Sequence, residues 1–185
     1  MDYFYDLKNT VKQALAEDVG TCDLTAELVE ETTQATAKVI VKEPAVLCGK
    51  IWAEETIFQV DPEIRTEWQF EDGEEVASGE ILVTLDGKAR SILTAERTML
   101  NFMQFLSAVA TKTRNLVEKI KHTNSQLLDT RKTIPGLRLA QKYAVKIGGG
   151  QNHRIGLFDA FLIKENHIKA AGGISNAIEK AKKVN

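Results

Sequence analysis

Cationic and hydrogen-bonding side chains follow two apolar segments that the sequence predicts to be strands. Arg131 and Lys132 come directly after QLLDT, and Lys164 ends DAFLIK. Between them lies GGGQNHRIG, which carries His153 and Arg154 on a glycine-rich loop. In parallel sheets and α/β barrels, functional groups collect at the carboxyl ends of the strands. We therefore expect these side chains to converge on one pocket.

These residue types are suited to a multiply charged anion. Arginine pairs bidentately with carboxylate or phosphate, and the two lysines can act as movable point charges. His153 can donate to the anion or move a proton near neutral pH. A solvated surface position is the commoner role for any single lysine, but a group of cations with few acidic neighbours needs a compensating anion. The residues predict a site for a small molecule with several carboxylates or phosphates and leave the reaction type open.

The charge distribution points to the same part of the chain. The protein has 24 Lys and Arg against 26 Asp and Glu, a formal charge of −2, which argues against general nucleic-acid binding. Residues 1–128 carry 13 Lys and Arg against 22 Asp and Glu, whereas residues 129–185 carry 11 against 4. An anion is expected in the basic part. The sequence has no GxxxxGKS/T, GxGxxG, HExxH or GxSxG motif, so ATP hydrolysis, dinucleotide binding, zinc hydrolysis and serine acylation lack support.

The first part of the chain predicts an α+β unit. Apolar residues at helical spacing predict helices over residues 3–18, ended by Gly20, and over residues 52–60. Short β-prone segments separated by turn signals predict strands at AKVIVK, AVLCG, RTEWQF, EILVTL and KARSIL.

A long helix is expected next, with Thr94 as its N-cap and its end near Lys121. Its apolar stripe belongs either to the core or to a subunit interface. Arg97 would lie in the first turn, where the helix dipole slightly disfavours a cation. Arg97 is therefore either a surface residue or an anion ligand presented beside the free N–H groups of the helix N-terminus.

After residue 123 the pattern changes to strand, helix, strand, helix, at QLLDT, residues 137–146, DAFLIK and residues 174–184. This alternation predicts a parallel sheet or an α/β barrel. We expect two domains, residues 1–112 and residues 113–185, with the anion site in the second.

The sequence predicts neither a membrane span nor a signal peptide. The longest uncharged stretch, residues 98–111, is shorter than the roughly 18 to 20 residues that a span needs, and residues 1–20 carry charges. A cytoplasmic location is expected. Cys22 and Cys48 lack the CxxC spacing of a zinc or redox site and are interpreted as ordinary thiols.

Two segments, TAERTMLNFMQFLSAVAT and DTRKTIPGLRLAQKYAVKIGGGQNHRIGLFDAFLIKENHI, closely resemble the quinolinate phosphoribosyltransferase family, and the resemblance extends over the whole chain. It implies an α+β amino-terminal sandwich domain followed by the first part of an α/β (TIM-like) barrel. The implied reaction is phosphoribosyl transfer from phosphoribosyl pyrophosphate to quinolinate with decarboxylation, in NAD biosynthesis. By this resemblance the site residues are Arg97, Thr130, Arg131, Lys132, His153, Arg154 and Lys164, with Lys132, His153 and Lys164 as catalytic residues.

The resemblance also implies partners. Mg²⁺ would bind together with phosphoribosyl pyrophosphate, and the protein would act by positioning and charge stabilisation. In the family, the arginine matching Arg97 reaches the neighbouring subunit's site, so a homodimer or higher homo-oligomer is expected. Neither a nucleic acid nor a membrane is an expected partner.

One departure from the family concerns length. The family's barrel continues with strands that bear a glutamate and an aspartate, and these positions would lie beyond Asn185, so the metal ligands are unknown. Residues 113–185 are too few for a closed barrel, which takes about 250 residues, and we expect an incomplete barrel with uncovered apolar faces. Two alternatives stay open: a truncated, non-catalytic module that binds a dicarboxylate or phosphate anion, and a phosphoribosyltransferase-like protein associated with molybdate transport.

Overall fold

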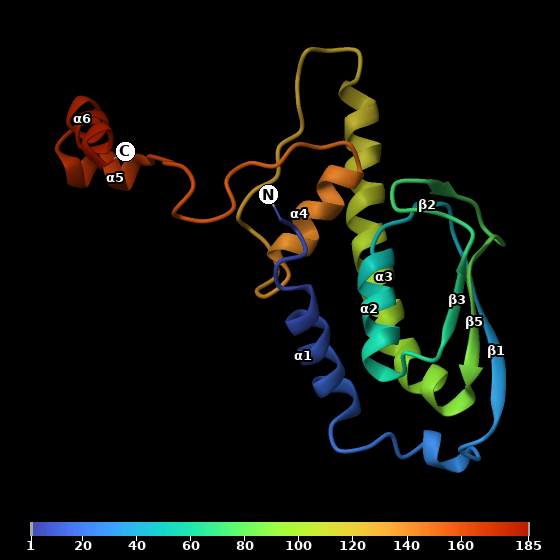
Figure 1. Cartoon of the computed structure of the whole chain (residues 1–185). Coiled ribbons are helices and arrows are strands. Elements are labelled where there is room, and N and C mark those ends of the chain that lie inside the picture. The colour runs from blue at the N-terminus through green and yellow to red at the C-terminus, as the bar shows by residue number, and fades with distance from the viewer. Residues whose placement is uncertain (1, 185) are drawn as a thin grey trace. The chain divides into compact units, whose positions relative to one another are not determined.

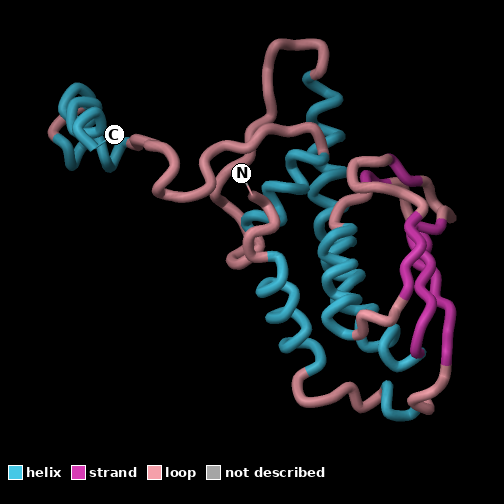
Figure 2. Tube along the Cα trace, viewed as in Figure 1, coloured by secondary structure: helices cyan, strands magenta, loops and turns pink. Residues whose placement is uncertain are grey.

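The computed structural model describes residues 2–184 and divides into two compact units between His153 and Arg154. Figure 1 labels most of the helices and strands, and Figure 2 colours the chain by secondary structure. The first unit contains α1 to α4, β1 to β5 and a short 3-10 helix, and the second contains α5 and α6. The domain division expected after residue 112 stays a prediction.

An antiparallel sheet forms one layer of the first unit. It has the strand order β1-β5-β3, with bounds Gln34–Ile40, Ile81–Lys88 and Arg65–Trp68. Residues of β1 alternate between exposed and half-buried, as a strand does when one of its faces lies on the core. A separate antiparallel pair is formed by β2 (Ala45–Val46) and β4 (Glu75–Val76).

Helices cover one face of the sheet (Figure 1). The two nearest the sheet are α2 (Lys50–Val60) and the long α3 (Ala89–Ile120). α1 (Leu7–Val19) packs on both of them, and α4 (Arg138–Ile147) packs on α3. A 3-10 helix (Ala26–Leu28) comes between α1 and β1 in the chain and contacts α3. α3 is thus the common support of the first unit.

Two buried apolar clusters share α3. The first lies between the sheet and the helices and includes Val83 and Met99. The second joins α1, α2, α3 and α4 and includes Trp52, Leu106 and Ala144. Full burial of a large apolar side chain stabilises the fold by about 1.5 to 3 kcal/mol. Because the second cluster holds α4 on α3, α3 fixes the position at which the loop after α4 begins.

The second unit is thinly packed. It consists of an irregular segment over residues 154–164, then α5 (Glu165–Ala171) and α6 (Ile174–Val184). Gly172, with a φ of +85°, ends α5 in the left-handed conformation that favours glycine. Within residues 154–184, the buried residues are Gly156 and Ala177.

The predicted helices α1, α2, α4 and α6 are confirmed within a few residues of their expected bounds. The predicted strands at AKVIVK, AVLCG, RTEWQF and EILVTL are confirmed as β1, β2, β3 and β5. Sequence spacing predicts neither the two-residue β4 nor α5. No helix within residues 2–184 is both long enough and apolar enough to cross a bilayer.

The prediction of a strand at KARSIL is wrong, because β5 ends at Lys88 and α3 begins at Ala89. Thr94 is therefore not the N-cap; its hydroxyl donates instead to Asp23 Oδ2 at 2.9 Å. The β-branched Ile92 is buried in the first apolar cluster from its place on the helix. Tertiary packing thus overrides the local strand preference.

The two strands expected in the basic part are also corrected. QLLDT forms only an isolated parallel bridge between Leu128 and Gln151, and residues 159–164 of DAFLIK form no strand. A strand needs a neighbour for its backbone N–H and C=O groups. In the part of the chain that the structure describes, no strand pairs with residues 159–164.

Candidate anion-binding site

The segment 130–132 begins where the parallel bridge ends. The Gln151 N–H donates to the Leu127 carbonyl at 2.8 Å, and the Asp129 N–H donates to the Gln151 carbonyl at 3.1 Å. These two hydrogen bonds hold the chain before residue 130 beside the chain after Gly150. The bridge therefore brings the segment 130–132 next to the loop that carries His153.

The glycines before Gln151 are required by packing. A Cβ on Gly148 would lie 2.5 Å from the Ala110 carbonyl oxygen and 2.6 Å from Thr113 Cβ, both on α3. Gly149 has a φ of +91°, which favours glycine. Gly148 therefore lets the chain pass close to α3.

A buried ion pair lies under the loop. Lys142 Nζ is 2.6 Å from Asp129 Oδ1, and the two side chains are 0% and 7% exposed. Asp129 Oδ1 also accepts the His153 N–H at 2.8 Å, while its Oδ2 accepts a hydrogen bond from Asn152 Nδ2 at 2.8 Å. Lys142 Nζ donates to the His153 carbonyl at 3.1 Å. The pair thus holds both backbone polar groups of His153.

The N-terminal segment reaches this network through Tyr3. The Tyr3 hydroxyl donates to Asn152 Oδ1 at 2.5 Å, and its ring lies edge-on to Tyr143 with centroids 5.6 Å apart. Burial, followed by the negative charge of Asp129, raises the pKa of Tyr3. Burial, followed by the charge of Asp72, also raises the pKa of Tyr143, whose hydroxyl donates to Asp72 Oδ2 at 2.9 Å. Both phenols therefore stay protonated as hydrogen-bond donors.

Arg131 offers the clearest sign of an anion ligand. The residue is half-buried, and its Nε is buried without a hydrogen-bond partner in residues 2–184. A buried donor without an acceptor is costly, and a carboxylate or phosphate would supply one. Next to it, Lys132 is exposed, and its N–H donates to Thr130 Oγ1 at 3.0 Å.

Arg97 does not lie where the sequence places it. Because α3 begins at Ala89, this exposed arginine falls in the third turn and cannot use the free N–H groups of the helix N-terminus. The glycine loop contacts α3 at Ala110 and Thr113, and Ala110 is about 20 Å further along the helix axis at 1.5 Å per residue. A single copy of the chain therefore does not bring Arg97 to the His153 loop.

Arg154 and Lys164 belong to the second unit and are held there by local contacts. Arg154 donates to the Ala160 carbonyl at 3.1 Å. Lys164 is exposed just before α5, and its backbone N–H donates to His167 Nδ1 at 3.0 Å. Asp159 accepts the N–H groups of Ile155 and Gly156, and these hydrogen bonds hold the pKa of its carboxyl below the usual value.

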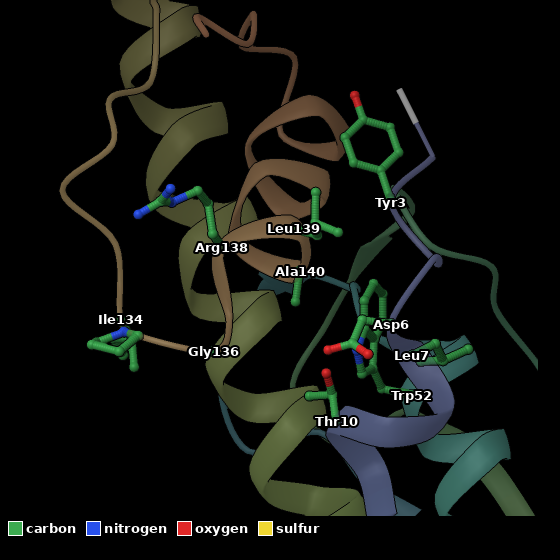
Figure 3. Close-up of a pocket in the computed structure, with 11 residues that line it drawn as sticks. Tyr3, Asp6, Leu7, Thr10, Trp52, Ile134, Gly136, Arg138, Leu139 and Ala140 are labelled. Carbon is green, nitrogen blue, oxygen red and sulfur yellow. The ribbon is translucent and has the colours of Figure 1, made fainter. Parts of the chain in front are cut away.

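A cavity of about 330 Å³ lies elsewhere in the first unit, between α1 and residues 134–140 (Figure 3). Figure 3 shows Asp6 on the α1 side, Leu139 on the α4 side, and the Arg138 guanidinium directed away from Asp6. The volume would suit a small ligand, but none of the predicted site residues lines the cavity. The cavity therefore shares Tyr3 with the network under the His153 loop, but no predicted anion ligand lines it.

Three residues of the site network, Asp129, Lys142 and Tyr3, escape prediction from the sequence. A carboxylate at the end of an apolar segment and just before two cations is a usable signal for Asp129. Lys142 carries no such signal, because helical spacing alone predicts a solvated lysine. Tyr3 reaches Asn152 across 149 positions of the chain, which local patterns do not reveal.

Comparisons with known proteins find relatives over most of the chain. The family model for the quinolinate phosphoribosyl transferase N-terminal domain matches residues 23–107, and the model for its C-terminal domain matches residues 109–185. A curated relative from Nicotiana glauca, quinolinate phosphoribosyltransferase (decarboxylating) 1, is 45% identical over 179 residues, which cover 94% of this chain and 50% of the relative. The chain thus spans about half the length of that relative.

Bacterial relatives agree with this match. The probable nicotinate-nucleotide pyrophosphorylase (carboxylating) of Bacillus subtilis is 38% identical over 176 residues, covering 95% of this chain and 61% of the relative. The solved structure of the nicotinate-nucleotide pyrophosphorylase from Francisella tularensis is similar with a TM-score of 0.93 and 54% identity, covering 97% of this chain and 64% of that one. The order of the two domain models confirms the expected fold class, an α+β domain followed by part of a barrel domain.

Proposed function

Because the chain belongs to the quinolinate phosphoribosyltransferase family, we propose that it forms the quinolinate-binding part of an enzyme that transfers a phosphoribosyl group to quinolinate. The products would be nicotinate mononucleotide, pyrophosphate and CO₂, in NAD biosynthesis. The observation that carries this proposal is the buried Nε of Arg131, which lacks a partner in residues 2–184 and lies in the segment held beside the His153 loop.

The proposed roles follow the chemistry of the two substrates. Quinolinate carries two adjacent carboxylates, to which we assign the guanidinium groups of Arg131 and Arg154. Lys132, His153 and Lys164 are assigned to the region shared by a carboxylate and the phosphates of phosphoribosyl pyrophosphate. Thr130 belongs to the same binding segment, where its hydroxyl accepts the N–H of Lys132.

In the proposed reaction the pyridine nitrogen uses its lone pair to form a bond to the anomeric carbon of the ribose, as the bond from that carbon to pyrophosphate breaks. The positive charge of the resulting pyridinium stabilises the electron pair that stays on C2 when the 2-carboxylate leaves as CO₂, and this pair then takes a proton from solvent. Neither step needs a protein nucleophile. The cationic side chains would act by orienting the substrates and stabilising charge.

Mg²⁺ is proposed only as a companion of phosphoribosyl pyrophosphate. Residues 2–184 contain no group of three or more His, Cys, Asp or Glu side chains suited to a metal ion. The Asp129 carboxylate is buried and engaged by Lys142. The described residues therefore contain no cluster that would hold Mg²⁺ without the phosphates of the substrate, and none of the steps above depends on one.

Arg97 is proposed to serve the site of a second copy in a homodimer. Its exposure and its separation of about 20 Å from Ala110 along α3 support a role outside its own chain's His153 loop. C2 dimers are the commonest homo-oligomers. A cytoplasmic location and the absence of nucleic-acid and membrane partners stay predictions.

The test of the proposal is quinolinate binding measured by calorimetry. We expect the chain to bind quinolinate and Arg131→Ala to weaken binding by about 10-fold or more, since hydrogen bonds to charged groups contribute about 1.5 to 3 kcal/mol. Arg65→Ala on the exposed end of β3 is the matched control and should bind as the parent does. Equal affinity of the parent and Arg131→Ala would refute the anion site.

Product formation separates the alternatives. Release of nicotinate mononucleotide and CO₂ from quinolinate, phosphoribosyl pyrophosphate and Mg²⁺ would support the full reaction. Quinolinate binding without product would favour the non-catalytic dicarboxylate-binding module. Competition by molybdate against quinolinate would favour the protein associated with molybdate transport.

A further inference from the structure

We infer that the buried Lys142–Asp129 pair is a positioning device that fixes the His153 backbone relative to the segment 130–132. The inference rests on the proposed function, because it assigns these two residues a role in shaping the same quinolinate site. Neither side chain can touch a ligand directly, since they are only 0% and 7% exposed. They are therefore positioning residues and not catalytic ones.

The geometry of the pair is a clamp on one residue. Asp129 Oδ1 accepts the His153 N–H at 2.8 Å, and Lys142 Nζ donates to the His153 carbonyl at 3.1 Å. The two clamping groups are themselves joined at 2.6 Å. The peptide groups on both sides of His153 are thus held by one ion pair, which fixes the direction in which the imidazole leaves the backbone.

The same pair also holds the segment 130–132, which carries Arg131. Asp129 directly precedes Thr130 and Arg131, and its N–H is bonded to the Gln151 carbonyl. Its Oδ2 accepts Asn152 Nδ2, which also donates to the Lys142 carbonyl at 2.9 Å. A shift of the Asp129 carboxylate would therefore move the segment 130–132 and the His153 loop relative to each other.

Stability alone does not account for such a pair. Removing two charges from water carries a large desolvation penalty, and apolar residues of similar volume often stabilise a core as well or better. A buried polar network with every member satisfied instead makes one local geometry strongly preferred. In this network each oxygen of Asp129 has a donor, as a positioning role requires.

Tyr3 extends the clamp to the N-terminal segment. Its hydroxyl donates to Asn152 Oδ1 at 2.5 Å, so the Asn152 amide is bonded through both its oxygen and its nitrogen. This contact lies at the edge of the network and involves neither buried charge. It offers a mild perturbation of the same device.

The decisive experiment replaces both charges at nearly constant volume. In the full chain, Asp129→Leu with Lys142→Met removes the clamp, and Asp129→Asn with Lys142→Met removes the charges but keeps an oxygen that can accept the His153 N–H. Two quantities are measured: quinolinate affinity by calorimetry, and amide exchange by NMR at His153 and in the α3 core. The control is Glu118→Leu with Lys121→Met. These changes remove an exposed ion pair between Glu118 on α3 and Lys121, the C-cap residue of that helix.

We expect the Leu/Met variant to bind quinolinate about 10-fold more weakly or worse and to lose His153 amide protection selectively. The Asn/Met variant should recover part of the quinolinate affinity and part of the His153 amide protection, and the control should match the parent in both quantities. A purely structural role would change all slow amides together. Parental affinity in the folded Leu/Met variant, or weaker binding with His153 protection intact, would overturn the inference.

Two contingencies keep the test decisive. If the Leu/Met variant does not fold, Tyr3→Phe takes its place and should lower affinity by about 2- to 10-fold with faster exchange at His153; no change in either quantity would overturn the inference. If the parent chain itself does not bind quinolinate, the proposed function fails. In that case amide exchange alone tests the positioning role. Selective loss of His153 protection in the Leu/Met variant would support the role, and intact protection would overturn it.

Discussion

Among the residues that the structure describes, only the first of the two compact units buries large apolar side chains. In the first unit, Leu106 is 0% exposed and Trp52 is 2% exposed, in one of two clusters that share α3. In the second unit, Phe158 is 85% exposed and Ile174 is 62% exposed. Two apolar clusters that share α3 therefore hold the first unit together, whereas short local contacts hold the second.

This difference divides the predicted anion site. Arg131 and His153 are supported by a buried ion pair under the loop. Arg154 is held by one hydrogen bond to the nearby Ala160 carbonyl, and Lys164 by one from its own N–H to His167. Residues from one sequence motif thus have two kinds of support. Changes in the first unit should act on global stability, and changes in the second should act locally.

The largest expected effect is that of Leu106→Ala in the core of the first unit. Truncation of a fully buried leucine leaves a cavity and should lower the free energy of unfolding by about 2 to 5 kcal/mol. The matched change in the second unit is Ile178→Ala, at a side chain 44% exposed, where we expect a change within about 0.5 kcal/mol. Urea denaturation measures both, and equal losses would remove the distinction between the units.

A second, smaller effect is expected for Gly148→Ala. The new Cβ would meet the Ala110 carbonyl oxygen at 2.5 Å, and overpacking of this kind costs about 1 to 3 kcal/mol. Gly173→Ala in the second unit is the control, because its Cβ would meet open space and only its φ of +123° is unfavourable. Urea denaturation should show a loss in the first unit for Gly148→Ala only. Unchanged unfolding of Gly148→Ala would mean that α4 and its loop are not fixed by α3.

Predictability from the sequence follows the same division. The periodic patterns that predict α1, α2, β1 and β5 arise from faces buried on one core, so local spacing carries the information. The expected strand at DAFLIK is apolar as well, but a strand also requires a neighbour to pair with. No pattern within the segment supplies that neighbour, and the segment is irregular here.

The sequence predicts the candidate anion ligands, but it does not predict the residues that hold them in place. Arg131 and His153 can be identified because cations and imidazole follow apolar segments and glycines. Lys142 looks like any helical lysine, and its burial depends on Asp129, thirteen positions away. The prediction that Arg97 lies in the first turn of the helix is wrong, because residues 89–93 also belong to α3. This extension of the helix is a consequence of packing, which local propensity does not show.

The third prediction concerns alkaline pH, to which the first unit should be sensitive. Burial raises the pKa of the Cys48 thiol above its usual 9.0, and burial with Asp72 raises that of Tyr143 above 10.0. Both groups are neutral when protonated, so the folded state keeps protons that the unfolded chain loses. Stability should be full below pH 9 and fall above it, by about 1 kcal/mol at pH 10 from Cys48 alone.

Urea denaturation at pH 8 and pH 10 checks this expectation. Cys48→Ala is the control, because it removes the thiol and should show a smaller loss between the two pH values, although its stability is lower at both. Equal losses in the parent and in Cys48→Ala would show that the buried thiol does not link proton release to unfolding. The alkaline sensitivity would then have no origin in the Cys48 environment.

The smallest expected effect is local and lies in the second unit, at Asp159. Its carboxylate accepts the Ile155 N–H at 2.6 Å and the Gly156 N–H at 2.9 Å, and these bonds, with the nearby charge of Arg154, hold its pKa below the usual 3.8. The folded loop favours the ionised form. Its contribution to stability is therefore present above pH 3.8 and is lost as the pH falls through the lowered pKa.

Amide protection factors measured by NMR between pH 5 and pH 2 should show the loss at Ile155 and Gly156. Asp159→Asn removes the titration, so its protection at these two amides should be lower at pH 5 and should change less on acidification. Because the loop shares no part of the first unit's core, the same variant should leave the unfolding free energy of the first unit unchanged. A loss there would mean that the two units support each other, and that Arg154 depends on the first unit's core as Arg131 and His153 do.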